Sequence, residues 1–105
     1  STKVGDAIEL NSIQKLFSDN KDIKMSSTKS SIGHLLGGAG SAEAVFSILA
    51  IRDQVAPPTI NLDNPARETP NHLAPNQKVS KEINFAISNS FGFGGTNASL
   101  LLAKV

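Results

Sequence analysis

The sequence predicts an α/β domain, and three patterns in its 105 residues support this prediction. Residues 5–17 carry apolar side chains three and four positions apart, which is typical of an amphipathic helix. A second, buried helix is expected over about residues 34–52, because the run at 42–51 is apolar almost all round and too long for a typical strand. Two apolar stretches, 83–88 and 99–105, have the length and composition of strands.

The first helix carries signals at both of its ends. Asp6 followed by Glu9 fits the Asp-x-x-Glu form of a capping box, so these two acids are expected to cap the helix. Ser18, Asp19 and Asn20 form a polar turn signal that ends the helix. Both acids therefore have a structural explanation.

The rest of the chain divides into strands and connections. Residues 23–28 are short and moderately apolar, so we expect a strand there. Two successive prolines and an Asn-Pro pair exclude a helix over residues 57–65. Residues 66–80 are polar and irregular and predict a long surface connection. The strands at 83–88 and 99–105 are expected to pair as a hairpin around a glycine-rich loop.

Composition and charge argue against several classes of function. Ten Lys plus Arg against nine Asp plus Glu give a formal net charge of +1, and no basic run with interleaved aromatics indicates a nucleic-acid partner. The chain has no cysteine, which excludes disulfides, thiolate zinc sites and a thiol nucleophile within these residues. No apolar run approaches the roughly 20 residues of a membrane span, so no membrane partner is expected.

Residues 1–105 are expected to form a single, incomplete domain. The sequence lacks an initiator Met and begins close to the entry of a helix. The second helix is apolar on several sides, and one amphipathic helix with two or three strands can hardly cover it. We therefore expect more protein to pack against this chain.

The stretch from residue 25 to residue 43 holds four glycines between a strand-like and a helix-like run. This order resembles a phosphate-binding turn, but no Lys follows the glycines as a Walker motif requires. Glu43 stands where a Rossmann turn needs a small residue, and its carboxylate would repel a pyrophosphate. Close backbone packing explains the glycines better.

His34 and Lys29 are the residues of this stretch that could carry chemistry. A nearby cation and a helix N-terminus would both favour a neutral imidazole, which can stabilise an enolate oxygen. The alternative is a structural histidine within an apolar run, and spacing alone leaves both interpretations open. Metal binding through His34 and His72 is disfavoured, because they lack the paired spacing of zinc ligands.

Phe91 and Phe93 lie inside the glycine loop of the predicted hairpin. A Phe between Gly92 and Gly94 can be moved by backbone changes that other residues resist, so it could gate a pocket. It could equally be a hydrophobic plug in a tight turn. The sequence does not decide between the two.

Three motifs together resemble the C-terminal part of a β-ketoacyl-[acyl-carrier-protein] synthase, closest to type II. They are Ser-Ser-Thr-Lys-Ser-Ser-Ile-Gly-His-Leu-Leu-Gly-Gly-Ala-Gly, then Pro-Pro-Thr-Ile-Asn-Leu-Asp-Asn-Pro, then Asn-Ser-Phe-Gly-Phe-Gly-Gly-Thr-Asn. Their order and spacers match over essentially all 105 residues. The opening Ser-Thr-Lys-Val-Gly-Asp-Ala-Ile-Glu resembles the segment after the family's Asn-Ala-His-Gly-Thr motif, although Lys3 stands where proline is more usual.

The resemblance implies a thiolase-like condensing enzyme that elongates fatty acids and works as a homodimer. This chain would supply the last part of the C-terminal half: a mixed sheet with one parallel strand, a C-terminal antiparallel hairpin and the two helices. The reaction is a decarboxylative Claisen condensation of malonyl-acyl-carrier protein with an acyl group on a cysteine. Acyl-carrier protein is the implied partner, and the cysteine and the first histidine would precede Ser1. The chain alone is therefore expected to be inactive.

The resemblance also assigns residues. His34 matches the second histidine, which donates to the malonyl thioester oxygen, and Lys29 matches the lysine that supports it. Phe93 matches the gate phenylalanine, whose N–H also belongs to the oxyanion hole. The remaining assignments are Thr2, Phe91 and Gly94 as substrate-binding residues, Thr2 at the pantetheine arm, and Glu43, Ser88 and Asn89 as a structural monovalent-cation site, with no required cofactor.

A different class of function is a stand-alone module that binds an acyl group or carrier protein without chemistry. Saturable binding of acyl-carrier protein by a well-folded monomer would favour it.

The expected location is the bacterial cytoplasm, with an organelle as the alternative.

Overall fold

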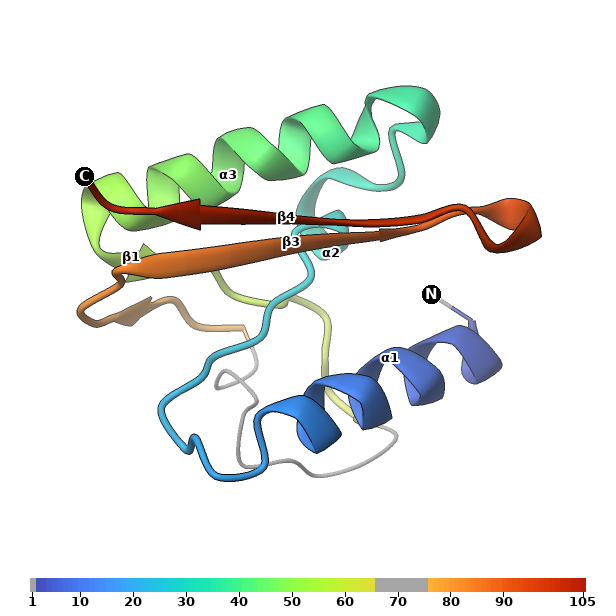
Figure 1. The fold of residues 1–105 in the computed structure, drawn as a ribbon, viewed down its shortest axis with the longest axis horizontal. Coiled ribbons are helices and arrows are strands. Elements are labelled where there is room, and N and C mark those ends of the chain that lie inside the picture. The colour runs from blue at the N-terminus through green and yellow to red at the C-terminus, as the bar shows by residue number, and fades with distance from the viewer. Residues whose placement is uncertain (1, 66–75) are drawn as a thin grey trace.

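The computed structural model describes residues 2–65 and 76–105 and has the α/β composition that the sequence predicts. Figure 1 shows helix α3 along one side of the hairpin of β3 and β4, with α1 on the other side. The helices are α1 (Lys3–Leu16), α2 (Lys29–Ile32) and α3 (Ala39–Asp53), with 3-10 helices η1 (Leu36–Gly38) and η2 (Phe93–Gly95). The strands are β1 (Val55–Ala56), β2 (Val79–Ser80), β3 (Phe85–Phe91) and β4 (Asn97–Ala103).

Helix α1 confirms that a helix forms here, although none of its residues is buried in this structure, and it begins at Lys3 because Thr2 provides its N-cap. Thr2 Oγ1 accepts a hydrogen bond from Gly5 N at 3.0 Å, and Asp6 Oδ1 accepts one from Thr2 N at 3.3 Å. The predicted capping box of Asp6 and Glu9 is therefore wrong. An N-cap must stand just outside the helix, and the chain is already helical at Asp6.

Helix α3 begins at Ala39 and not near residue 34 as predicted. The cause lies in the backbone before it, where Leu36 has a φ of 51°. A positive φ cannot continue a right-handed helix, so the chain turns there and enters α3 through η1. The turn separates the His34 segment from the helix that follows.

The helix is also less buried than its composition predicts. Its buried residues are Ala39 and Ile51, whereas Val45 and Ile48 are 53% and 52% exposed. The prediction of a buried helix is therefore only half right. The hairpin covers one side of α3, and no described element covers the side of Val45 and Ile48.

The C-terminal hairpin is confirmed, with boundaries two or three residues from those predicted. Strands β3 and β4 pair antiparallel from Phe85 opposite Ala103 to Phe91 opposite Asn97. Gly92 N donates to Thr96 O at 2.8 Å and closes the loop. A Cβ on Gly92 would lie 2.8 Å from that same oxygen, so only glycine fits this close approach.

Gln54 joins the end of α3 to the chain entering the hairpin. It ends the helix with a φ of 56° in the left-handed region. Its side-chain Nε2 donates to Ile83 O at 2.9 Å, and its Oε1 accepts from Ile83 N at 2.9 Å. One amide thus pairs both backbone groups of a residue 29 positions away. Nothing local in the sequence predicts this contact.

The predicted strand at residues 23–28 is wrong for this structure, where only Met25 makes an isolated bridge. A strand needs a neighbouring backbone to pair with, and the strand pairs among the described residues are both antiparallel and formed elsewhere. The pair of β1 and β2 was not predicted, and β2 lies in the segment 66–80 that was expected to be irregular. Residues 66–75 of that segment lie outside the described part.

The proline-rich segment at 57–65 is non-helical, as its two prolines predict.

Within the described ranges, no helix is long and apolar enough to cross a membrane. The buried apolar residues in the described part are Ala39, Ile51 and Ala56, so the core is thin and centred where α3 meets the strands.

Candidate functional site

The proline-rich segment holds the chain on both sides of Lys29. Ser27 N donates to Thr59 Oγ1 at 2.9 Å, and Ile60 N donates to Ser30 Oγ at 3.0 Å. These bonds join the second sequence motif to the first across about thirty residues. The proline-rich segment thus contributes a side-chain acceptor at Thr59 and a backbone donor at Ile60. The motif therefore positions the short helix α2 that carries Lys29.

Lys29 Nζ forms an ion pair with Glu43 Oε1, which links α2 to the first turns of α3. The Glu43 side chain is 12% exposed and that of Lys29 is 35% exposed. The second oxygen, Glu43 Oε2, is buried without a hydrogen-bond partner among the described residues. A buried carboxylate oxygen without a donor is costly, so this atom is a natural place for a cation or a donor.

Glu9 on α1 belongs to the same electrostatic group. Burial raises the pKa of the Glu9 carboxyl, and the negative charges of Asp6 and Glu43 raise it further, while Lys29 lowers it. The Lys29 ammonium thus forms an ion pair with Glu43 of α3 and also acts on Glu9 of α1, so one positive charge interacts with carboxyl groups of both helices. Sequence reasoning gave Glu9 a capping role and did not connect it with Lys29.

Replacing Glu9 by glutamine is expected to stabilise the protein at neutral pH. An acid whose pKa is raised by folding favours the folded state below its unfolded pKa of about 4.5 and loses that contribution as pH rises through the folded value. The wild-type protein should therefore lose stability over this window relative to Glu9→Gln. Urea unfolding between pH 3 and 8 measures the difference. A pH-independent difference would contradict the assignment, and Glu82→Gln, on an exposed residue, is the control.

His34 is held by the backbone two residues after it. Leu36 N donates a hydrogen bond to His34 Nδ1 at 3.1 Å. An accepting nitrogen carries no proton, so the ring proton of the neutral imidazole lies on Nε2. His34 itself is exposed. The arrangement therefore presents a neutral N–H donor at the surface of this part of the chain.

The backbone of Leu36 makes this contact by an uncommon conformation. Its φ of 51° is in the left-handed region, which leucine rarely adopts, and its side chain is exposed. Such strain is found where the surrounding structure fixes it, often at functional sites. Leu36 was not predicted as a site residue, because a leucine beside glycines gives no signal of a positive φ.

The hairpin loop and the His34 segment lie at the same end of the molecule (Figure 1). A Cβ on Gly40, near the start of α3, would lie 3.6 Å from Ser90 Oγ at the end of β3. Phe91 is 57% exposed and Phe93 is fully exposed. Phe93 is therefore not a plug in this structure, and its role as a gate stays a prediction. Gly94 has a φ of 74°, which gives the loop its turn.

The other predicted site residues are placed as follows. Thr2 uses its hydroxyl oxygen as the cap of α1. Ser88 lies on the face of β3 that packs on α3, whereas the adjacent Asn89 points to the opposite face, where its Oδ1 accepts from Ser99 Oγ at 2.7 Å. In the described part of the chain, no group of three His, Asp or Glu residues could hold a metal ion.

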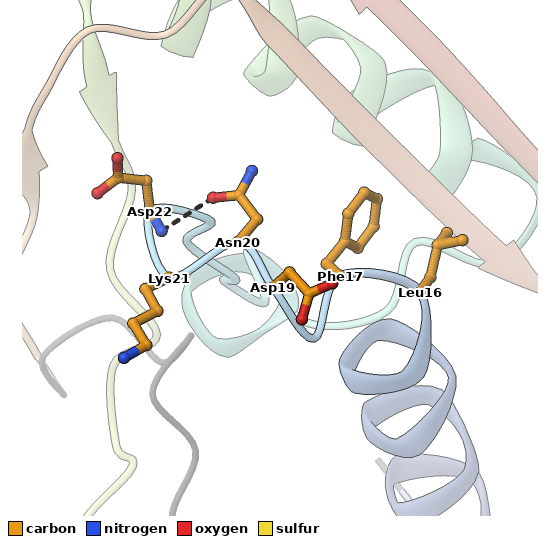
Figure 2. Close-up of a pocket in the computed structure, with 6 residues that line it drawn as sticks. All are labelled: Leu16, Phe17, Asp19, Asn20, Lys21 and Asp22. Atoms are coloured by element: carbon orange, nitrogen blue, oxygen red, sulfur yellow. Dashed lines mark hydrogen bonds between the residues drawn. The ribbon is translucent and has the colours of Figure 1, made fainter.

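Two hollows of the surface lie away from these residues. The first hollow has a volume of about 570 Å³ and surrounds the turn after α1 (Figure 2). This turn forms as predicted, and within it Asp22 N donates to Asn20 Oδ1 at 3.0 Å. The second, of about 360 Å³, lies between α2, α3 and the proline-rich segment. Neither is lined by His34, Lys29 or Phe93. The candidate site is thus an open surface in this chain.

Comparison with known proteins gives these motifs a family. Residues 1–63 match the family model described as "Beta-ketoacyl synthase, C-terminal domain". The chain is 58% identical to a 3-oxoacyl-[acyl-carrier-protein] synthase 2 of Rhizobium meliloti over 99% of its length and 25% of that protein. It is 49% identical to the corresponding protein of Coxiella burnetii, over the whole chain and 26% of the relative. It is also 49% identical to a mitochondrial 3-oxoacyl-[acyl-carrier-protein] synthase of Arabidopsis thaliana, over the whole chain and 24% of the relative.

The match extends over all three motifs that suggested the resemblance, because the relatives align with essentially the entire chain. The chain spans about a quarter of the length of these relatives. The chain belongs to the beta-ketoacyl synthase family, in the region of its C-terminal domain.

Proposed function

We propose that this chain supplies the malonyl-activating part of a 3-oxoacyl-[acyl-carrier-protein] synthase. The observation that carries the proposal is the hydrogen bond from Leu36 N to His34 Nδ1, which leaves a neutral Nε2–H exposed. Family membership supports it, since the relatives are named for this synthesis. The expected outcome in the cell is fatty-acid elongation.

The chemistry that His34 would perform is electrostatic. Loss of CO₂ from a malonyl thioester breaks one C–C bond and leaves its electron pair on the α-carbon and the thioester oxygen as an enolate. A preorganised N–H donor stabilises this oxygen more in the transition state than in the ground state. The α-carbon then attacks the acyl thioester carbonyl, and a cysteine thiolate leaves. These 105 residues contain no cysteine, so the nucleophile must come from other residues.

Lys29 and Glu43 would support His34 from the adjoining helix ends. The pair fixes α2 against α3 and places one positive charge in the segment that carries His34. We propose further that Glu43, Ser88 and Asn89 border a structural monovalent-cation site. The unpartnered Glu43 Oε2 fits a cation, and Ser88 lies on the matching face of β3. The Asn89 side chain points away and accepts from Ser99, so Asn89 would have to contribute through its backbone.

The substrate would be held at the end of the molecule where the hairpin loop lies. Phe93, which projects into solvent, has the freedom that a gate over an acyl group requires. Phe91 and Gly94 would shape the loop next to it. Thr2 would contact the pantetheine arm of the carrier. The Thr2 hydroxyl group would then serve both as the cap of α1 and as a substrate contact.

The thiolase-like assembly is part of the same proposal. The uncovered side of α3 would be buried in a complete subunit. Acyl-carrier protein would deliver both substrates to a homodimer. The relatives are bacterial and mitochondrial, so we propose the bacterial cytoplasm or an organelle as the location.

A chimeric enzyme tests the proposal. The 105 residues replace the matching quarter of the Rhizobium meliloti relative, and condensation of malonyl- and acyl-carrier protein is measured. We expect the chimera to be active and the 105-residue chain alone to be inactive. A folded but inactive chimera, or turnover by the chain alone, would contradict the proposal. Saturable binding of acyl-carrier protein by the isolated monomer, with an inactive chimera, would support the stand-alone binding module.

Substitution of Leu36 tests how His34 is held. Leu36→Gly keeps the N–H and accepts a positive φ, so we expect the Nε2–H tautomer and the activity of the chimera to persist. Leu36→Pro removes the donor and forbids this φ, and should lower decarboxylation by about tenfold, the value of one hydrogen bond. Nitrogen NMR of His34 reports the tautomer without any substrate. Equal tautomer populations in both variants would contradict the assignment.

A further inference from the structure

Helix α2, which carries Lys29, has few contacts of its own to hold it in place. It is four residues long, none of its residues is buried, and no side chain caps its N-terminus. A helix of a single turn is not stable in isolation. The position of α2 therefore depends on its bonds to other segments of the chain.

Thr59 and Ser30 supply two such bonds, which we call the Thr59–Ser30 clasp. Thr59 Oγ1 accepts a hydrogen bond from Ser27 N at 2.9 Å. Ser30 Oγ accepts one from Ile60 N at 3.0 Å. Thr59 and Ser30 are both half-buried, and each of the two segments contributes one side-chain acceptor and one backbone donor. Because one bond is made before Lys29 and one after it, the clasp fixes the orientation of α2 as well as its distance from the proline-rich segment.

The proline-rich segment can support α2 because Thr59 is itself held by a third segment. Asn76 N donates to Thr59 O at 3.1 Å, and Asn76 Oδ1 accepts from Asn61 N at 2.6 Å. Pro57 and Pro58 fix two φ angles directly before Thr59. The backbone at Thr59 therefore has little freedom, and its hydroxyl group is presented to α2 at a defined place.

Lys29 connects the clasp to His34 through its backbone and its side chain. Lys29 O accepts from Gly33 N at 2.9 Å, and Gly33, with a φ of 74°, directly precedes His34. Lys29 Nζ forms the ion pair with Glu43. A rotation of α2 would therefore displace both the charge of Lys29 and the backbone that leads into His34.

We infer that Thr59 and Ser30 are positioning residues, which act through α2 to fix the charge of Lys29 and the start of the His34 segment for malonyl decarboxylation. The inference rests on the proposed function of His34 as a donor to the malonyl oxygen. Both hydroxyl groups are already acceptors within the chain, so neither is assigned a contact with the substrate. All four groups of the clasp belong to the described part of this chain, so the clasp forms without residues from a longer protein.

Amide hydrogen exchange in the 105-residue chain tests whether the clasp holds α2. Thr59→Val removes the acceptor and nearly keeps the shape of the side chain, whereas Thr59→Ser keeps the hydroxyl group. We expect Thr59→Val to speed exchange of the Gly33 amide about tenfold, the value of one hydrogen bond, and Thr59→Ser to leave it near the wild-type rate. Thr28→Val is the matched control, since the Thr28 side chain does not cap α2. Unchanged exchange in Thr59→Val would overturn the inference.

Malonyl decarboxylation by the chimera tests whether the position of α2 matters for the reaction. We expect Thr59→Val to lower kcat about tenfold with little change in KM, and Thr59→Ser to restore most of the loss. Transfer of the acyl group to the cysteine should stay close to the wild-type rate. An equal loss in both half-reactions, or faster amide exchange without a loss of decarboxylation, would also overturn the inference.

Two further measurements keep the outcomes apart. Far-UV circular dichroism establishes that each variant is folded, and Ser30→Ala, which removes the other bond of the clasp, replaces Thr59→Val if the latter is not. Decarboxylation that His34→Ala leaves unchanged would refute the proposed function and not the clasp. In that case the exchange of the Gly33 amide still decides whether Thr59 and Ser30 hold α2.

Discussion

Replacing His34 by alanine in the chimeric enzyme is expected to slow malonyl decarboxylation by about a hundredfold or more. Loss of one preorganised donor to a developing oxyanion has a cost of this order, because no other donor takes its place in the transition state. His34 is exposed, so the substitution removes little buried surface and the protein should stay folded. Release of acetyl-carrier protein from malonyl-carrier protein measures this half-reaction.

Transfer of the acyl group to the cysteine should suffer much less from the same substitution, since it does not generate the malonyl enolate. His34→Gln is the matched control. Its amide retains an N–H donor and should recover part of the decarboxylation that alanine loses. Equal loss of both half-reactions, or equal activity of the alanine and glutamine variants, would refute the donor assignment.

Removing Lys29 is expected to destabilise the chain by about 1–3 kcal/mol. The Glu43 side chain is 12% exposed, and its Oε2 already lacks a partner, so Lys29→Met leaves a buried carboxylate without the pairing seen here. The lower part of the usual range applies, because Lys29 is one-third exposed and water can reach the site. Urea unfolding at low protein concentration measures the loss.

The double variant Lys29→Met with Glu43→Gln separates the pair from the packing of the lysine stem. It should be more stable than Lys29→Met alone, because the unpaired charge is gone. Substitution of Lys104, which is exposed near the C-terminus, controls for general charge effects. A double variant no more stable than the single one would show that the ion pair does not govern the stability of this region.

The local elements were largely readable from the sequence. The 3.6-residue period of α1 and the apolar strands of the hairpin gave the right type and order of element, because both patterns depend on residues close in the chain. Boundaries were less certain. The cap of α1 is at Thr2 and not at Asp6, because the N-cap lies where the backbone enters the helix, and the spacing of Asp6 and Glu9 imitates a capping box inside the helix.

Non-local pairings could not be predicted in the same way. The strand expected at residues 23–28 has the right composition but makes only an isolated bridge at Met25 in the described part of the chain, whereas β1 and β2 pair without a compositional signal. Strand formation is decided by which backbones lie side by side. For the same reason, nothing in the sequence around Gln54 predicts its hydrogen bonds with the backbone of Ile83.

The sequence by itself determined the family of this protein, the residues that resemble a condensing-enzyme site, and the order of its helices and hairpin. Only the tertiary structure decided that Lys29 pairs with Glu43, that Glu9 joins them, and that Leu36 donates to His34. A motif shows which side chains are present, but not which of them come into contact. Ion pairs, burial and a positive φ depend on how segments far apart in the chain pack together, so no local period or spacing in the sequence predicts them.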